Sequence, residues 1–129
     1  MKKKVLIIEN DRDIRDIISY VLEDKGYEVI AAEPWPVNRL HTYNPDLILL
    51  DEWLNEREGH LLCTELKDMH ETKHVPVIIL STANNIEEIA NSCKAEGFVN
   101  KPFDLDELLE EVQRCFFVDG KTNLVDLPI

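Results

Sequence analysis

The chain has 129 residues, a length typical of one domain, and its 26 acidic and 14 basic side chains give a net charge of −12 at pH 7. This balance argues against nucleic-acid binding, because contacts to phosphate backbones select for Lys and Arg. The apolar fraction of 44% indicates a globular core. No apolar run approaches the roughly 18 residues of a membrane span, so we expect no membrane segment and a cytoplasmic location.

Strands and helices are predicted to alternate from the start of the chain. Val5–Ile8 is a short apolar run, typical of a strand covered on both faces. A helix follows, because apolar residues recur at helical spacing over 14–22 and Gly26 suits its C-terminal cap. Tyr27–Ala32 is predicted as the second strand. A second helix over 33–44 has the weakest pattern, because its two prolines fit the start of a helix and not its interior.

The same two patterns predict the rest of the chain. Leu47–Leu50 forms a continuous apolar strand that ends at Asp51. Helices are expected over 61–69, 86–93 and 105–116, and strands over 77–80 and 98–100. Gly97 is expected to close the fourth helix, and Asp104 and Glu107 occupy capping positions at the start of the last one.

Five successive strand–helix units predict an α/β fold. We expect a flavodoxin-like, doubly wound parallel sheet of five strands in the order 2-1-3-4-5, with five helices. The domain would span residues 1–118, and 119–129 would form a short tail. The cysteines at 63, 93 and 115 are odd in number, widely spaced and on helix faces, so we interpret them as buried, reduced thiols.

Polar side chains follow four of the predicted strands. They are Glu9, Asn10 and Asp11 after the first strand, Asp51 at the end of the third, Ser81 and Thr82 after the fourth, and Lys101 after the fifth. The carboxyl ends of parallel strands meet at one edge of the sheet, where α/β proteins place their chemistry. Clustered carboxylates repel one another, and Mg²⁺, which prefers oxygen ligands, relieves the repulsion. Beside such a cation, Asp51 could attack phosphorus, with a lysine and a hydroxyl stabilising the phosphoryl oxygens.

These residues resemble the signature of the receiver domain of response regulators in two-component systems, over about residues 3–118. The matching parts are the cluster Glu9-Asn10-Asp11, the set Asp51, Leu54 and Gly59, the hydroxyl of Ser81 30 residues after Asp51, the triplet Lys101-Pro102-Phe103, and the aromatic Phe98. Each part alone is a weak signal. Their order on the expected elements makes the resemblance specific.

The resemblance implies a role for each matching residue. Asp51 would be the phosphoacceptor. Mg²⁺ would be bound by Glu9, Asn10, Asp51 and the backbone carbonyl of Trp53, with Asp11 as a further candidate. Ser81, Lys101 and Phe98 would contact the phosphoryl group or respond to it, with Thr82 as the alternative hydroxyl. The Lys101–Pro102 peptide bond would be cis.

The resemblance also implies partners. A sensor histidine kinase or a histidine phosphotransfer protein would supply the phosphoryl group. A downstream protein would dock on the face made by the fourth helix, the fifth strand and the fifth helix. We expect a stand-alone switch, whose only chemistry is its own phosphorylation and dephosphorylation, rather than an enzyme.

Two positions depart from the pattern of the family. Asn10 stands where the second acid usually binds Mg²⁺, so metal affinity should fall or be lost. Asn55 replaces a usual proline, which we regard as a minor change. The alternative hypothesis is therefore a receiver-like module that binds partners without being phosphorylated.

Other motifs in the sequence fit less well. His70-Glu71-Thr72-Lys73-His74 matches the zinc-protease pattern, but a helix must end before Val75–Pro76 and the surroundings are polar. A calcium loop would need a glycine and a terminal glutamate that the segment 10–13 lacks. Asp-x-Asp phosphatase chemistry needs an acid where Trp53 stands. A flavin phosphate site would be repelled by the acids after the first strand.

Overall fold

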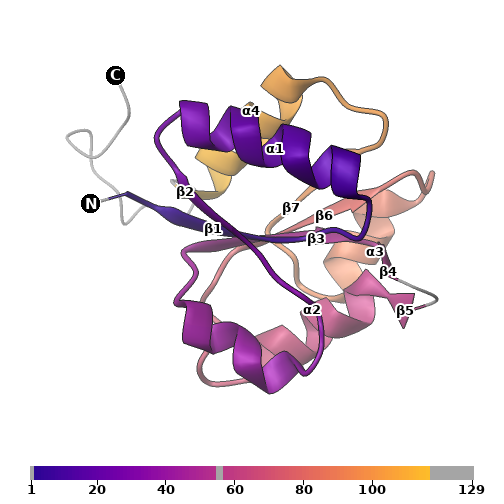
Figure 1. The fold of residues 1–129 in the computed structure, drawn as a ribbon. Helices are drawn as coiled ribbons and strands as arrows, with labels where there is room; N and C mark the ends of the chain where they lie inside the picture. Colours follow the sequence, from indigo (N-terminus) through magenta and orange to yellow (C-terminus); the bar gives the residue numbers. More distant parts are fainter. Residues whose placement is uncertain (1, 55–56, 117–129) are drawn as a thin grey trace.

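The computed structural model of the protein describes residues 2–54 and 57–116. Its main sheet consists of five parallel strands in the order β2-β1-β3-β6-β7 (Figure 1). The strands are β1 (Lys4–Ile8), β2 (Glu28–Ala31), β3 (Leu47–Asp51), β6 (Val77–Ser81) and β7 (Gly97–Asn100). In chain order this is the predicted arrangement 2-1-3-4-5, so the fold class is confirmed.

Helical elements cover both faces of the sheet. Helices α1 (Arg12–Asp24) and α4 (Leu105–Phe116) lie on one face, and α2 (Gly59–Asp68) and α3 (Ile86–Ser92) lie on the other (Figure 1). The helix expected over 33–44 is a 3₁₀-helix, η1 (Val37–Tyr43), on the same face as α2. It begins after its two prolines, which fits the inability of proline to donate a hydrogen bond inside a helix.

Alternation along the strands divides the core into two layers. One set of strand side chains packs against α1 and α4 and the other packs against η1, α2 and α3. Every residue of β3 and β6 is buried, which explains why these strands appear in the sequence as continuous apolar runs. The central strands therefore end in a well-packed part of the molecule, and the side chains at their carboxyl ends are held in place.

The structure corrects two details of the prediction. Gly97 does not close a helix, because α3 ends at Ser92 and Gly97 is the first residue of β7. A short antiparallel hairpin, β4 (Trp53–Leu54) with β5 (Arg57–Glu58), was not expected. Asn55 and the tail 119–129 lie outside the described residues.

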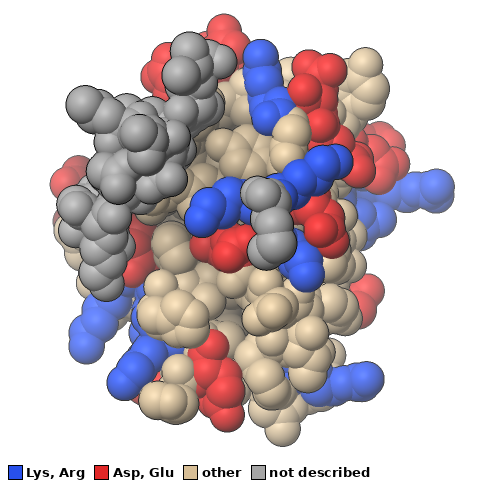
Figure 2. All heavy atoms as spheres, turned by 90° about the vertical axis from the view of Figure 1, so that its left-hand side faces the viewer, with Lys and Arg blue, Asp and Glu red and all other residues tan. Residues whose placement is uncertain are grey.

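The surface carries both signs of charge. Figure 2 shows the end of the molecule at the left of Figure 1, where Lys and Arg side chains are interspersed with Asp and Glu. Within residues 2–54 and 57–116, no helix has the length and apolar character required to cross a membrane.

Candidate functional site

Three charged side chains from different strands meet at the carboxyl edge of the sheet. The Nζ of Lys101 lies 2.8 Å from Oδ1 of Asp51 and 2.9 Å from Oε1 of Glu9. Glu9 follows β1, Asp51 ends β3 and Lys101 follows β7. The strand order reverses between β1 and β3, which is the position where open α/β sheets bind their ligands. The sequence prediction that these three groups converge is confirmed.

The alternation of the strands explains why the three side chains share one face. The residues two and four positions before Glu9 and Asp51, and two before Lys101, belong to the core layer beneath α1 and α4. Side chains two apart on a strand point to the same side. Continuing each strand by one step therefore directs all three polar groups to the same side of the sheet edge.

The cluster is buried and has an excess of negative charge. Asp51 is 6% exposed and Glu9 is 4% exposed, and the two carboxylates share one ammonium group. Burial raises the pKa of Asp51 to about 6, and the neighbouring Glu9 adds to the rise, although the hydrogen bond from Lys101 opposes it. Burial lowers the pKa of Lys101, but its hydrogen bonds to Asp51 and Glu9 outweigh this effect and the net change is upward.

The two candidate hydroxyls lie in different surroundings. Ser81 ends β6, is 4% exposed, and accepts a hydrogen bond from the backbone N–H of Ala83. Thr82 is exposed and lines an apolar groove of about 490 Å³ together with Pro102 and Phe103. Both stand at the edge of the sheet that carries Asp51, so neither is removed from consideration by its position.

Two further features at this edge bear on expectations from the sequence. The Lys101–Pro102 peptide bond is cis, as the resemblance implied. Phe98 is half-buried against the core, and its backbone N–H donates to the carboxylate of Glu111. The ring therefore packs against the core. This position is compatible with a role in core packing and with a role as an aromatic residue that responds to phosphorylation.

The donor set at this edge suits Mg²⁺. Glu9 and Asp51 supply two buried carboxylates with uncompensated charge, and the exposed Asn10 adds an amide oxygen directly after Glu9. Mg²⁺ is bound by a few such oxygens and keeps several waters. The side chain of Asp11 is the N-terminal cap of α1, because its Oδ1 accepts hydrogen bonds from the backbone N–H groups of residues 13 and 14. The side chain of Trp53 is 57% exposed, so its expected contribution is through the backbone alone.

Gly59 is required by the backbone around Asp51. A Cβ atom at position 59 would collide with the backbone carbonyl oxygen of Asp51. The first residue of α2 is thus packed directly against the last residue of β3. This steric clash explains why a glycine stands eight positions after Asp51.

Glu52 fixes the start of α2 next to this edge, a role that sequence reasoning missed. Its carboxylate accepts hydrogen bonds from the backbone N–H and from Nδ1 of His60, at 2.8 and 2.7 Å. The Nε2 of His60 lies 3.3 Å from Glu58. Ligand atoms of these three residues lie within 4.8 Å of one another. Because the two ring nitrogens contact different glutamates, the cluster as it stands is a hydrogen-bonded chain rather than a set of ligands around one point.

The segment that matches the zinc-protease pattern is not helical. Residues 70–74 form turns after the end of α2 at Asp68. The buried hydroxyl of Thr72 donates to the carbonyl oxygen of Leu66 and holds these turns against the helix. A metal site of that pattern needs both histidines on one helix face.

The chain matches known proteins over most of its length. The model of the response regulator receiver domain family matches residues 5–113. The phosphate regulon transcriptional regulatory protein PhoB of Escherichia coli K12 is 31% identical over 117 residues, which cover 88% of this chain and 51% of PhoB. The chain thus spans about half the length of the curated relatives it matches.

Solved structures of proteins from the same family superpose on most of this chain. The chemotaxis response regulator CheY4 of Vibrio cholerae superposes with a TM-score of 0.80 at 25% identity, covering 89% of this chain and 99% of CheY4. The receiver domain of NtrX from Brucella abortus superposes with a TM-score of 0.72 at 32% identity, covering 87% of this chain and 97% of that domain.

Proposed function

This chain belongs to the response regulator receiver family of two-component signalling, and on that premise we propose that it is a phosphoacceptor switch modified on Asp51. The observation that supports the proposal most directly is the contact of Lys101 with Asp51 and Glu9 at the switch point of the sheet. An ion pair with a purely structural role needs one acid for one base, whereas this site has a second buried acid. The excess charge suits a site that accepts a cation and a phosphoryl group.

The residues of the site have complementary roles in the transfer. The Asp51 carboxylate attacks phosphorus, forming an O–P bond while the N–P bond of a donor phosphohistidine breaks. With a pKa of about 6, Asp51 is largely ionised at neutral pH and therefore available as a nucleophile. Lys101, which pairs with Asp51 before transfer, turns its ammonium group to the phosphoryl oxygens. Ser81 supplies the hydroxyl that hydrogen-bonds one of those oxygens.

Mg²⁺ is the expected cofactor of the transfer. Glu9, Asn10, Asp51 and the carbonyl of Trp53 would hold it, and it would neutralise charge that develops on the phosphoryl oxygens. Because Asn10 replaces a charged ligand with a neutral one, we expect weaker binding than two adjacent acids would give.

The signal would leave through the face formed by α3, β7 and α4. Phosphorylation adds roughly −1.5 to −2 charges at Asp51, and Lys101 follows β7, the strand that carries Phe98. A change at Lys101 is thereby transmitted to this strand, where Glu111 of α4 binds the backbone N–H of Phe98. A phosphate that binds one arrangement of this face better shifts the population toward it. A sensor kinase or phosphotransfer protein would act upstream and a protein bound to this face downstream.

Intact mass spectrometry tests the proposal. The protein is incubated with Mg²⁺ and a small phosphodonor such as acetyl phosphate, and we expect a gain of one phosphoryl group. The gain should be absent without Mg²⁺ and absent in Asp51→Asn. Asp46→Asn is a matched control, because Asp46 accepts a backbone hydrogen bond at the opposite end of β3.

The alternative function is a receiver-like module that binds a partner without phosphorylation. The neutral side chain of Asn10 favours it. A protein that gains no mass with any donor, even at high Mg²⁺ concentration, but binds its partner equally well as wild type and as Asp51→Asn would support this alternative and refute the switch.

A further inference from the structure

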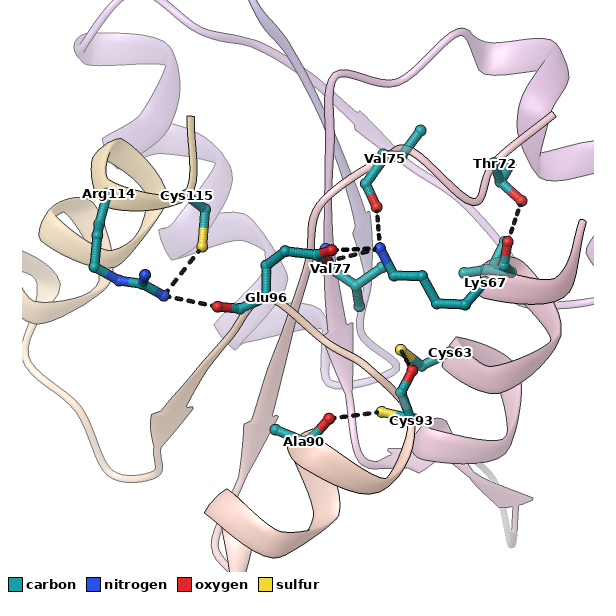
Figure 3. Close-up of polar contacts among 11 residues, drawn as sticks. Cys63, Lys67, Thr72, Val75, Val77, Ala90, Cys93, Glu96, Arg114 and Cys115 are labelled. Atoms are coloured by element: carbon teal, nitrogen blue, oxygen red, sulfur yellow. Dashed lines mark hydrogen bonds and ion pairs between the residues drawn. The ribbon is translucent and has the colours of Figure 1, made fainter. Parts of the chain in front are cut away.

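Two of the three cysteines meet beneath the sheet although 30 residues separate them along the chain. Cys63 lies in α2 and Cys93 directly follows α3, and the two helices share one core layer. The Sγ of Cys63 donates to the carbonyl oxygen of Cys93 at 3.3 Å, and the Sγ of Cys93 donates to the carbonyl oxygen of Ala90 at 3.5 Å (Figure 3). Sequence periodicity places each cysteine on a helix face but does not show that the two faces meet.

The two thiols differ in acidity because each influences the ionisation of the other. The neighbouring Cys63 lowers the pKa of Cys93 to about 7, helped by the backbone N–H of Ala95 and opposed by burial. The same contact, together with burial, raises the pKa of Cys63. The pair therefore combines a more acidic thiol with a less acidic one, which is the arrangement of an attacking and a resolving cysteine.

We propose that Cys63 and Cys93 form an intramolecular redox couple, which a peroxide converts to a disulfide that joins α2 to the end of α3. The Cys93 thiolate attacks one oxygen of hydrogen peroxide, forming an S–O bond while the O–O bond breaks and hydroxide leaves. The Cys63 sulfur then attacks the sulfenic sulfur, forming the S–S bond and releasing the second oxygen as water, with the Cys63 proton. Two thiols lose two hydrogens and two electrons, and one peroxide becomes two waters.

The disulfide acts on the part of the chain that links two residues of the candidate site. Ser81 precedes α3, and Lys101 follows β7, so Cys93 lies between them in the sequence. A covalent bond from Cys93 to α2 restrains this segment at its middle. This inference concerns modification of the thiols and does not depend on phosphorylation of Asp51.

Cys115 provides an internal control. It is buried in α4, in the core layer on the other face of the sheet, and burial raises the pKa of its thiol to about 12. It has the same side chain and a similar depth, but lacks a cysteine partner and an acidic thiol. Peroxide should therefore leave Cys115 unmodified under conditions that oxidise the pair.

The test is oxidation of the full chain with hydrogen peroxide, followed by trypsin digestion without reductant and mass spectrometry. Cleavage after Arg57, Lys67, Lys73 and Lys94 places the two cysteines in separate peptides, 58–67 and 74–94. We expect these peptides to appear joined, with two hydrogens fewer than their sum, and no disulfide-linked dimer to form. The midpoint of thermal unfolding should rise on oxidation and return with dithiothreitol.

Variants separate the roles of the two sulfurs. Cys63→Ala should leave a sulfenic acid on Cys93 that dimedone traps, whereas Cys93→Ala should leave Cys63 unmodified. Cys115→Ala should form the disulfide as the wild type does. The inference is overturned if the wild-type digest contains no joined peptide, if Cys93 is converted directly to sulfinic acid, or if a disulfide involves Cys115.

Discussion

Two partly buried lysines stand at opposite edges of the same sheet, and they differ in how their charge is balanced. Lys67 lies at the amino ends of β6 and β7, where its Nζ is 2.7 Å from Oε1 of Glu96 and 2.7 Å from the carbonyl oxygen of Val75 (Figure 3). Glu96 in turn accepts the backbone N–H of Val77. Lys101 lies at the carboxyl ends and faces two carboxylates.

The difference shows how a stabilising contact can be told from a reactive one. At Lys67, one base meets one acid, and the remaining hydrogen-bonding capacity is used by backbone groups, so the contact joins β6, β7 and α2. At Lys101, one base meets two buried acids and the pKa of Asp51 is raised to about 6. An ion pair with one acid for one base contributes to stability or costs little. A buried cluster with more acids than bases costs free energy, which is typical of a functional site.

Exchanging the two lysines for methionine should separate the two roles most clearly. We expect Lys101→Met to slow phosphorylation of Asp51 by acetyl phosphate on the order of 100-fold, the usual effect of removing one donor to a developing oxyanion. The rate is measured by intact mass over time at saturating Mg²⁺.

Lys67→Met is the matched control, with the same change in size and charge at the other edge. It should leave that rate unchanged but lower the free energy of unfolding by about 2 kcal/mol, less than for a fully buried pair because Glu96 is 34% exposed. Equal loss of phosphorylation in the two variants would show that the distinction between the lysines is wrong.

Removing one acid from each cluster should change stability in opposite directions. The raised pKa of Asp51 means that its ionised form costs folding free energy, with an upper limit of about 3 kcal/mol for a shift of about two units. In Mg²⁺-free buffer at pH 7, Asp51→Asn should therefore stabilise the protein by about 2 kcal/mol. Glu96→Gln should destabilise it by about 1 kcal/mol, because Lys67 loses its partner. Urea unfolding measures both.

The pH dependence of Asp51→Asn provides its own control. The cost of ionised Asp51 is absent below pH 3.8, grows as the pH rises toward 6 and is complete above that value. The stability difference between Asp51→Asn and wild type should thus shrink as the pH falls from 7 to about 5. A difference that stays constant over this range, or a destabilised Asp51→Asn, would contradict the charge imbalance.

The Lys101 cluster could be predicted from the sequence, but the Lys67 cluster could not. Asp51 and Lys101 follow apolar strand runs whose carboxyl ends must meet in a parallel sheet, so their proximity could be predicted. Lys67 and Glu96 gave no such signal, because helical periodicity does not show which side chains of separate elements touch. The β4–β5 hairpin was missed for a related reason, since strands of two residues are too short to show alternation.

Adding a charge to the Lys101 cluster should sharpen the contrast with the Lys67 cluster. Asn10→Asp brings a third carboxylate to the site, and one charge near a dication is worth on the order of 1 kcal/mol or more. We expect Mg²⁺ to bind roughly tenfold more tightly, as measured by isothermal titration calorimetry. Asn91→Asp, at an exposed position in α3, makes the same change in net charge and should leave the affinity unchanged. Equal gains in both variants would attribute the effect to overall charge.

The smallest expected effect tests whether access of water, rather than charge balance, sets the reactivity of the Lys101 cluster. Trp53 stands two residues after Asp51, and its indole could shield a phosphoryl group from hydrolysis. The ring is 57% exposed and lines a surface groove of about 740 Å³ with Arg57 and Leu61, and Asp51 does not line that groove.

We therefore expect Trp53→Asn to speed loss of phosphate by no more than about threefold at saturating Mg²⁺, equivalent to less than about 1 kcal/mol. Saturating metal removes any contribution from the weak ligand Asn10. Leu61→Asn, which removes apolar surface from the same groove away from Asp51, should have no effect. An acceleration well above threefold in Trp53→Asn alone would mean that the indole covers the phosphoryl group, and charge balance would then be an incomplete account of this site.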